Sequence, residues 1–346
     1  MTSLTRWYID TRHLTSSTEE LPLVETLQAN DQTAVEKYLR VPDKHMSLAS
    51  NLLKYFFIHR TCRIPWSEVI ISRTPKPHQR PCFIPSAGQG SLPAVEFNVS
   101  HQASFVALGG CIIPSVEGHN EQKDEENGQR VAAVYSDPKP SSAPVPAIPQ
   151  VGIDITCVDE PGRRRDKAPK TLKEVADFID IFSEVFSQRE LQTMKQYSST
   201  LRSSSPTATI ETVIKSTLRL FYAYWALKEA YIKMTGEALL APWLRELEFT
   251  DVVAPAPATS TPTSTAAWSE PYTGVQTWLY GKKVEDVRIE LVAFESDYLV
   301  ATAARGANLG SNSNSDGNDP WLALESIDID RDVRPCATGV CQCILE

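Results

Sequence analysis

Four polar stretches interrupt the chain and limit what it can fold into. They are rich in Pro, Ser, Thr or Asn, and such segments bury too little apolar surface to form a core, so we expect loops there. In chain order they are residues 114–150, about 198–209, about 252–266 and 305–319. The first is also acidic and is interpreted as a linker. Two compact domains remain, residues 1–113 and 151–304, followed by a tail at 305–346 that we expect to be flexible.

Hydrophobic periodicity predicts helices and strands in both domains. The N-terminal domain is expected to hold helices at about 31–40 and 44–60, then strands at 95–101 and 104–110. The C-terminal domain has three kinds of segment: a strand at 151–156, helices at about 171–195 and 217–236, and strands at 275–280, 287–294 and 298–304. Each domain places an amphipathic helix before a pair of strands and ends on a small-residue strand. This order indicates an α/β (α+β) fold and suggests a duplication.

Charge and cysteine content exclude several function classes. The chain of 346 residues has a formal net charge of −9, which argues against a nucleic-acid-binding protein but leaves room for a local phosphate pocket. The N-terminus lacks a signal-peptide pattern and no apolar run is long enough to cross a membrane, so we expect a cytoplasmic protein. The seven cysteines are scattered without CxxC pairs, and neither a disulfide framework nor a zinc site is predicted.

Two acidic residues lie among apolar neighbours. Asp154 interrupts the strand "VGIDIT", and Glu229 lies in an aromatic-rich helix one turn before Lys233. Taken singly, Asp154 could face solvent or cap a helix, and Glu229 with Lys233 could be an ordinary surface ion pair. Taken together, the two carboxylates could hold a hard divalent cation such as Mg²⁺, with open positions for water and phosphate oxygens.

Several residues of the N-terminal domain could contact phosphate. Ser100 and His101 close an apolar strand, and His101 could donate to a pyrophosphate or be a turn histidine without a function. Four basic residues could form a nucleotide pocket or lie in solvated loops: Arg40, Lys44, Arg73 and Arg80. The chain has no GxSxG, Walker loop or GxGxxG, which weighs against a serine hydrolase and a kinase-like enzyme.

Three motifs carry a family resemblance. In this order and at these separations, "FNVSHQASFVAL", "VGIDIT" and "WALKEAYIKMTGEAL" resemble the motif regions of the large, Sfp-like 4'-phosphopantetheinyl transferases, and the chain is similar to fungal members. The resemblance spans roughly residues 30–300. It implies a pseudo-dimer of two similar α/β halves, with the active site, coenzyme A and Mg²⁺ in the cleft between them. Because both halves are in one chain, we expect a monomer.

The resemblance also implies roles for single residues. Asp154 and Glu229 would be the Mg²⁺ ligands, and Glu229 and Lys233 the catalytic residues. Where many bacterial members have a second acid two residues after the first, this chain has Thr156, so a water molecule or the threonine hydroxyl would complete the metal shell. Coenzyme A would be bound by a larger set that includes candidates for its 3'-phosphate and adenine: Arg40, Lys44, Arg73, Arg80, Ser100, His101, Asp154 and Lys233.

The function implied is transfer of the phosphopantetheine arm of coenzyme A to a serine of an acyl or peptidyl carrier domain, releasing 3',5'-ADP. Glu229, directly or through a water molecule, would take the serine proton, and Lys233 would stabilise charge on the pyrophosphate. The carriers could belong to fatty acid, polyketide, peptide synthetase or lysine-pathway enzymes. Two alternatives remain at this point: a catalytically inactive carrier-binding module, and another Mg²⁺-dependent phosphotransferase that uses a nucleotide.

Overall fold

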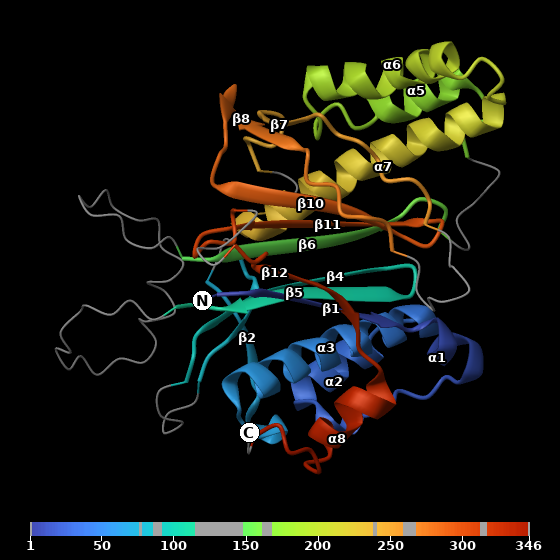
Figure 1. The fold of residues 1–346 in the computed structure, drawn as a ribbon. Coiled ribbons are helices and arrows are strands. Elements are labelled where there is room, and N and C mark those ends of the chain that lie inside the picture. Colours follow the sequence, from blue (N-terminus) through green and yellow to red (C-terminus); the bar gives the residue numbers. More distant parts are fainter. Residues whose placement is uncertain are drawn as a thin grey trace, which may run out of the picture. The chain divides into compact units, whose positions relative to one another are not determined.

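The computed structural model in Figure 1 divides the chain into two compact units. Unit 1 contains residues 1–153, 234–236 and 304–346, and unit 2 contains residues 154–233 and 237–303. None of the helices described is long and apolar enough to cross a membrane. The structure describes residues 2–75, 78–85, 92–114, 148–160, 168–237, 241–258, 268–311 and 317–344.

A four-stranded sheet forms the centre of unit 1, in the order β12-β1-β5-β4. Strands β4 (Val95–Gln102) and β5 (Phe105–Ile112) form an antiparallel hairpin, and β1 (Leu4–Asp10) pairs antiparallel with β5. The fourth strand, β12 (Trp321–Ser326), runs parallel to β1. The hairpin confirms the two strands predicted near residues 95 and 104, whereas β1 and β12 were not predicted.

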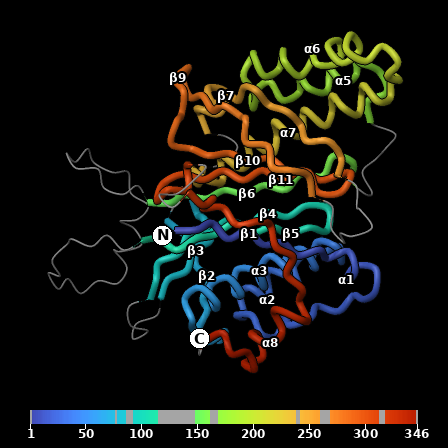
Figure 2. The backbone as a smooth tube through the Cα atoms, in the orientation of Figure 1, coloured from blue at the N-terminus to red at the C-terminus, as the bar shows by residue number. Residues whose placement is uncertain are grey.

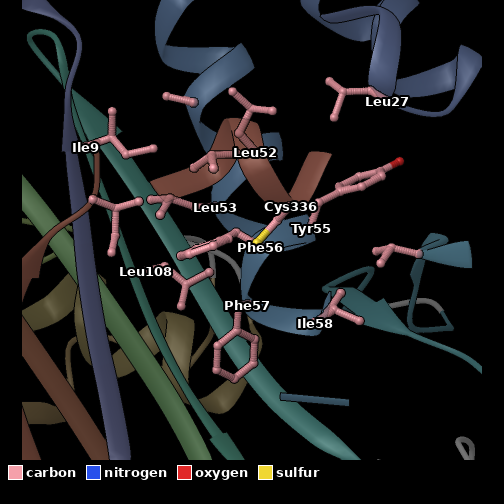
Figure 3. Close-up of a cluster of buried hydrophobic side chains, with 14 of the residues drawn as sticks. Ile9, Leu27, Leu52, Leu53, Tyr55, Phe56, Phe57, Ile58, Leu108 and Cys336 are labelled. Carbon is pink, nitrogen blue, oxygen red and sulfur yellow. The ribbon is translucent and has the colours of Figure 1, made fainter. Parts of the chain in front are cut away.

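Helix α3 (Val41–Cys62) covers one face of this sheet, as Figure 1 shows, and supplies much of the core of unit 1. Its side chains Phe56 and Phe57 point toward the sheet in Figure 3. A Cβ on Gly110 of β5 would lie 2.6 Å from the Phe57 ring, so this glycine permits the close approach of helix and strand. The remaining elements of unit 1 are α1 (Arg12–Ser17), η1 (Val24–Thr26), α2 (Ala29–Glu36), η2 (Trp66–Glu68), the paired strands β2 (Ile71–Arg73) and β3 (Pro81–Phe83), η4 (Ile329–Val333) and α8 (Arg334–Ala337).

The described part of unit 2 combines small sheets with the helices α5, α6 and α7. Sheet order is β10-β11-β6 in one sheet and β7-β8-β9 in another. The ring centroid of Phe221 in α7 lies 4.9 Å from that of Phe178 in α5 and 5.0 Å from that of Phe182, which follows α5. Aromatic contacts therefore join α7 to α5 and to the turn after it. The elements are β6 (Gln150–Cys157), which begins in unit 1, α5 (Leu172–Asp180), α6 (Gln188–Ser204), α7 (Ile210–Thr235), β7 (Leu247–Thr250), β8 (Gln276–Leu279), β9 (Lys282–Lys283), β10 (Val287–Phe294) and β11 (Tyr298–Arg305).

The expectation of a flexible tail over residues 305–346 is wrong for much of that segment. Strand β12 adds to the sheet of unit 1, and Trp321 is buried in a small apolar cluster with Leu4 and Leu309. Figure 2 shows the chain then running on to α8 beside α3. The physical reason is that apolar residues spaced along this segment, such as Val333, complete the core that α3 begins.

Two further expectations need correction. The single helix expected at about 171–195 is two helices, because Ser187 caps a new one: its hydroxyl accepts from the Glu190 N–H, and the Glu190 carboxylate accepts from the Ser187 N–H. The insertion expected at about 198–209 is partly helical, since α6 continues to Ser204. Most of the linker and of the insertion near 252–266 falls outside the described residues. The mixed α+β class is confirmed, while the pseudo-dimer, its cleft and the monomeric state stay predictions.

Candidate active site

Asp154 lies at the centre of a small polar cluster in unit 2. Strand β6 holds it, and Thr156 lies on the same face because side chains alternate along a strand. The Thr156 hydroxyl donates to Asp154 Oδ2 at 2.8 Å, and Lys233 Nζ donates to Oδ1 at 2.7 Å. The Asp154 side chain is only 7% exposed, whereas that of Lys233 is 25% exposed. The carboxylate is therefore fixed in orientation and paired with a cation that solvent still reaches.

Glu229 belongs to the same cluster. It lies one helical turn before Lys233 on α7, half-buried, and makes no hydrogen bond or ion pair with any described residue. Burial raises the pKa of this carboxyl; the positive charge of Lys233 opposes that shift, and the negative charge of Asp154 adds to it. The structure thus places these three residues near one another within unit 2, and their roles as metal ligands and catalytic residues stay predictions.

The residue before Glu229 has a different role. Lys228 is completely buried and forms an ion pair of 2.9 Å with Glu190, whose side chain is equally buried. Lys228 also donates to the main-chain carbonyls of Leu244 and Leu247, so its three N–H donors are all used. Burial lowers the pKa of Lys228 and raises that of Glu190, and their mutual attraction opposes both shifts.

The sequence reasoning missed this buried pair. Glu190 also accepts from the main-chain N–H groups of Phe249 and Ser187, and in this way it ties the start of α6 to strand β7. A signal was available, because a serine followed three residues later by a glutamate is the pattern of a capping box. The same pair also fixes the rotation of α7: Lys228 faces the interior of the unit, which leaves Glu229 and Lys233 on neighbouring positions of the helix surface.

The predicted coenzyme A residues of unit 1 are dispersed. Ser100 and His101 are successive residues of β4 and so point to opposite faces of the strand; Ser100 is buried and His101 is exposed. Arg40 is exposed at the N-cap of α3, and Lys44 is half-buried in its first turn. Arg73 is exposed at the end of β2, where it donates to the Gln79 carbonyl at 3.0 Å. Exposed basic groups of this kind are available to an anion.

Arg80 differs from the other three basic candidates. Its guanidinium is buried, forms an ion pair with Glu96, and donates to the Val151 carbonyl at 3.1 Å. A Cβ on Gly236 would lie 2.6 Å from Arg80 Cδ, and Gly236 also has a φ of +81°, so the glycine that follows α7 is required on both counts. In this arrangement Arg80 holds together segments of unit 1 and is not presented to solvent.

A pocket of about 650 Å³ lies elsewhere on unit 2. Residues from the start of α6, from β7 and from β8 line it, among them Arg189, Glu248 and Trp278. Asp154, Glu229 and Lys233 are not among its lining residues, so its volume gives no measure of the space at the carboxylate cluster.

Comparison with known proteins identifies the family. Residues 150–301 match the family model described as the 4'-phosphopantetheinyl transferase superfamily, and residues 15–113 match one described as 4'-phosphopantetheinyl transferase, N-terminal. The chain is 57% identical to 4'-phosphopantetheinyl transferase A of Aspergillus fumigatus, an alignment that covers 99% of this chain and 96% of the relative. The chain belongs to the 4'-phosphopantetheinyl transferase superfamily.

Other relatives of this transferase agree with that assignment. The chain is 50% identical to 4'-phosphopantetheinyl transferase NpgA of Emericella nidulans, with 99% of this chain and 96% of the relative covered. A mouse L-aminoadipate-semialdehyde dehydrogenase-phosphopantetheinyl transferase is 24% identical, with 65% of this chain and 53% of the relative covered. The resemblance found in the three sequence motifs is confirmed. The enzyme class follows from relatives that align over nearly the whole chain.

Proposed function

We propose that this enzyme transfers the 4'-phosphopantetheine arm of coenzyme A to a serine of an acyl or peptidyl carrier domain, releasing 3',5'-ADP, with Mg²⁺ at Asp154 and Glu229. The observation that carries the proposal is the cluster of these two carboxylates with Lys233 in unit 2. Oxygen ligands next to a partly exposed ammonium group suit a substrate whose reacting group is a pyrophosphate.

The residues present fit a hard divalent cation. Glu229 has two carboxylate oxygens without a described hydrogen-bond donor, and burial disfavours its charge in the absence of a counter-ion. Asp154 accepts a hydrogen bond from Thr156 on one oxygen and from Lys233 on the other, and an ionised carboxylate offers about four lone-pair sites in all. When bound, Mg²⁺ would neutralise charge that builds up on the pyrophosphate during transfer.

Three side chains of the cluster have separate roles in the transfer: proton acceptance, pyrophosphate binding and orientation of Asp154. Glu229 accepts the proton of the incoming serine, because a carboxylate with a raised pKa is a better base than an ordinary one. Lys233 donates to a pyrophosphate oxygen. Its ion pair with Asp154 fixes the ammonium group at a position that solvent reaches. Thr156 keeps Asp154 in one orientation through its hydrogen bond. It occupies the position at which many bacterial members of the family have a second acidic residue.

Exposed and half-buried groups of unit 1 are candidates for binding the rest of coenzyme A. His101, Arg40, Lys44 and Arg73 can donate to its phosphates, with arginine giving two-pronged contacts. Arg80 is the least suitable of the set, because binding a phosphate would require it to leave Glu96. We assign it a structural role, because it donates to the carbonyls of Val151 in β6 and of Met234 near the end of α7.

Intact-mass spectrometry of a purified apo carrier domain tests the proposal. The carrier is incubated with the full-length enzyme, coenzyme A and Mg²⁺, and separately with EDTA in excess of the metal. We expect the carrier to gain the mass of one phosphopantetheine arm, and 3',5'-ADP to appear in equal amount, only when Mg²⁺ is available.

A carrier whose acceptor serine is replaced by alanine is the matched control and should gain nothing. Acyl, peptidyl and reductase carriers are compared in parallel, because the names of the two fungal relatives mention no carrier, whereas that of the mouse relative mentions L-aminoadipate-semialdehyde dehydrogenase. Binding of coenzyme A without any mass gain on any carrier would contradict the proposal and would favour an inactive carrier-binding protein. A mass gain that persists in EDTA would contradict the proposed role of Mg²⁺ in the reaction.

A further inference from the structure

A second cluster of metal-binding side chains lies in unit 1, far along the chain from the acidic residues. Cys336 of α8 and the following Cys341 and Cys343 meet His59 of α3, and one ligand atom from each of the four lies within 4.8 Å of every other. His59 is 1% exposed and Cys336 is 2% exposed. Figure 3 shows the sulfur of Cys336 among the side chains of the α3 core. Cys341 and Cys343 are half-buried, so two of the four ligands lie in the core and two lie nearer the surface.

The distances fit tetrahedral coordination better than a disulfide. Cys336 Sγ lies 3.7 Å from Cys343 Sγ, and His59 Nε2 lies 3.3 Å from Cys341 Sγ. With zinc–sulfur bonds of about 2.3 Å, the edge of a tetrahedron is about 3.8 Å, whereas a disulfide needs about 2.05 Å between the sulfurs. These two separations are therefore close to those of a Cys₃His shell, and all four ligand atoms lie within 4.8 Å of one another.

The imidazole of His59 is oriented as a metal ligand. Its Nδ1 lies 2.7 Å from the Ile64 carbonyl oxygen. A carbonyl can only accept a hydrogen bond, so Nδ1 carries the proton, and Nε2 keeps its lone pair toward Cys341. Zinc-binding histidines commonly donate their second ring nitrogen to a carbonyl in this way, which fixes the ring and the tautomer.

We propose that His59, Cys336, Cys341 and Cys343 bind one structural Zn²⁺ that fastens the C-terminal segment to α3. Three sulfur ligands and one imidazole suit zinc and are unlike the oxygen ligands of a magnesium site. Four protein ligands leave no open position for a substrate, so the ion stabilises the fold and takes no part in phosphopantetheine transfer. The inference is independent of the proposed function.

The spacing of these ligands explains why the sequence did not predict a zinc site. The three cysteines are spaced as Cys-x4-Cys-x-Cys, without the CxxC pairs that mark many zinc sites, and the fourth ligand lies almost the whole chain away. Only the return of the C-terminal segment to α3, seen in Figure 2, brings them together. The C-terminal segment forms the short helices η4 and α8, which pack on unit 1 through apolar contacts. A zinc ion would attach this segment to α3 more firmly.

Metal analysis of the full-length protein tests this inference. Untagged wild-type protein, expressed with added zinc and purified under reducing conditions without chelator, is analysed by inductively coupled plasma mass spectrometry. We expect one zinc per chain. The variant Cys341→Ser/Cys343→Ser should lose most of it, while Cys62→Ser should keep it, because Cys62 lies in the same helix but donates to the Pro93 carbonyl outside the cluster.

Two further readouts separate loss of metal from loss of folding. Cobalt substituted into the wild-type protein should give the strong visible bands of tetrahedral coordination and a near-ultraviolet thiolate band, and both should be absent from the double variant. A chelator should lower the Tm of wild type and of Cys62→Ser, but not that of the double variant. Zinc retained in full by the double variant would overturn the proposal. The proposal would also be overturned if reduced wild-type protein neither contained zinc nor took it up. A disulfide among these cysteines in freshly purified protein would overturn it as well.

Discussion

Helix α7 carries two lysine–carboxylate pairs that have the same chemistry and opposite surroundings. In the pair Lys228–Glu190 both side chains are fully buried, and every lysine donor has a partner in unit 2. In the pair Lys233–Asp154 the lysine is 25% exposed, and Glu229 stands beside it without a hydrogen-bond partner among the described residues. Five positions along one helix separate the two lysines.

The difference teaches how to tell a structural ion pair from a reactive one. A buried charge is tolerable only when its hydrogen-bonding capacity is filled, and Lys228 with Glu190 meets that condition. Glu229 does not meet it, because burial raises the pKa of its carboxyl and no described residue donates a hydrogen bond to it. Unfilled capacity at a partly exposed position is what a ligand can use.

The largest effect is expected where the saturated pair is broken. Lys228→Met leaves Glu190 buried without its counter-charge, which should lower the free energy of unfolding by about 3–5 kcal/mol. Urea denaturation followed by circular dichroism measures the change. Lys215→Met on the same helix is the control, because Lys215 is exposed and its ion pair among the described residues is with Glu211, which is equally exposed. A loss below about 1 kcal/mol, the range of a surface pair, would mean that the pair is not the structural element inferred here.

Glu229→Gln tests the unsaturated cluster through activity. The amide keeps the shape but loses the negative charge needed for the metal and for proton transfer, so kcat/KM for carrier modification should fall at least about 100-fold, or about 2.7 kcal/mol. The thermal midpoint should hardly change.

Glu211→Gln is the matched control, an exposed acid on the same helix whose replacement should leave kcat/KM unchanged. Activity of Glu229→Gln within a few-fold of wild type would remove Glu229 from both proposed roles. A large loss of thermal stability would instead assign it to the structural class of Glu190.

Lys233→Met is expected to have an intermediate effect. It removes the ammonium group from the pyrophosphate and from Asp154, so kcat/KM should fall about 10- to 100-fold, while a partly exposed pair contributes only about 1 kcal/mol to stability. Steady-state kinetics at varied coenzyme A concentration measures the effect on binding and turnover separately. A stability loss as large as that of Lys228→Met, with activity retained, would reverse the assignment of the two pairs.

Much of this fold could be predicted because its signals are local. The hairpin near residues 95–112, strand β6 and the helix bearing Glu229 follow from alternation and helical periodicity. Strand β12 could not be predicted in the same way, because its apolar residues Leu322 and Ala323 are exposed and do not alternate with polar ones. Its place depends on pairing with β1, more than 300 residues earlier. Contacts of that kind leave little trace in a local window.

The candidate site was predicted only in part for the same reason. Asp154, Glu229 and Lys233 lie in strongly patterned elements, and their meeting follows from the family motifs. That Arg80 is buried against Glu96, or that Thr156 donates to Asp154, depends on tertiary packing that no spacing reveals. The cluster of His59 with three cysteines is the extreme case, since its ligands come from opposite ends of the chain.

The smallest expected effect is a pH dependence that distinguishes the two clusters without any substrate. Because burial raises the folded-state pKa of Glu229 above its ordinary value of 4.5, the folded protein binds more protons at this group than the unfolded protein does in the window above pH 4.5. Its contribution to stability therefore falls as the pH rises through that window. In metal-free protein, Glu229→Gln should match wild type at about pH 4 and be the more stable of the two at about pH 8. Urea midpoints of both proteins, measured with and without Mg²⁺, check this, and added Mg²⁺ should narrow the gap at the higher pH because the ion favours the ionised carboxylate. A gap that is constant with pH would show that Glu229 ionises as freely in the folded chain as in the unfolded one, and would place it with ordinary surface acids such as Glu211.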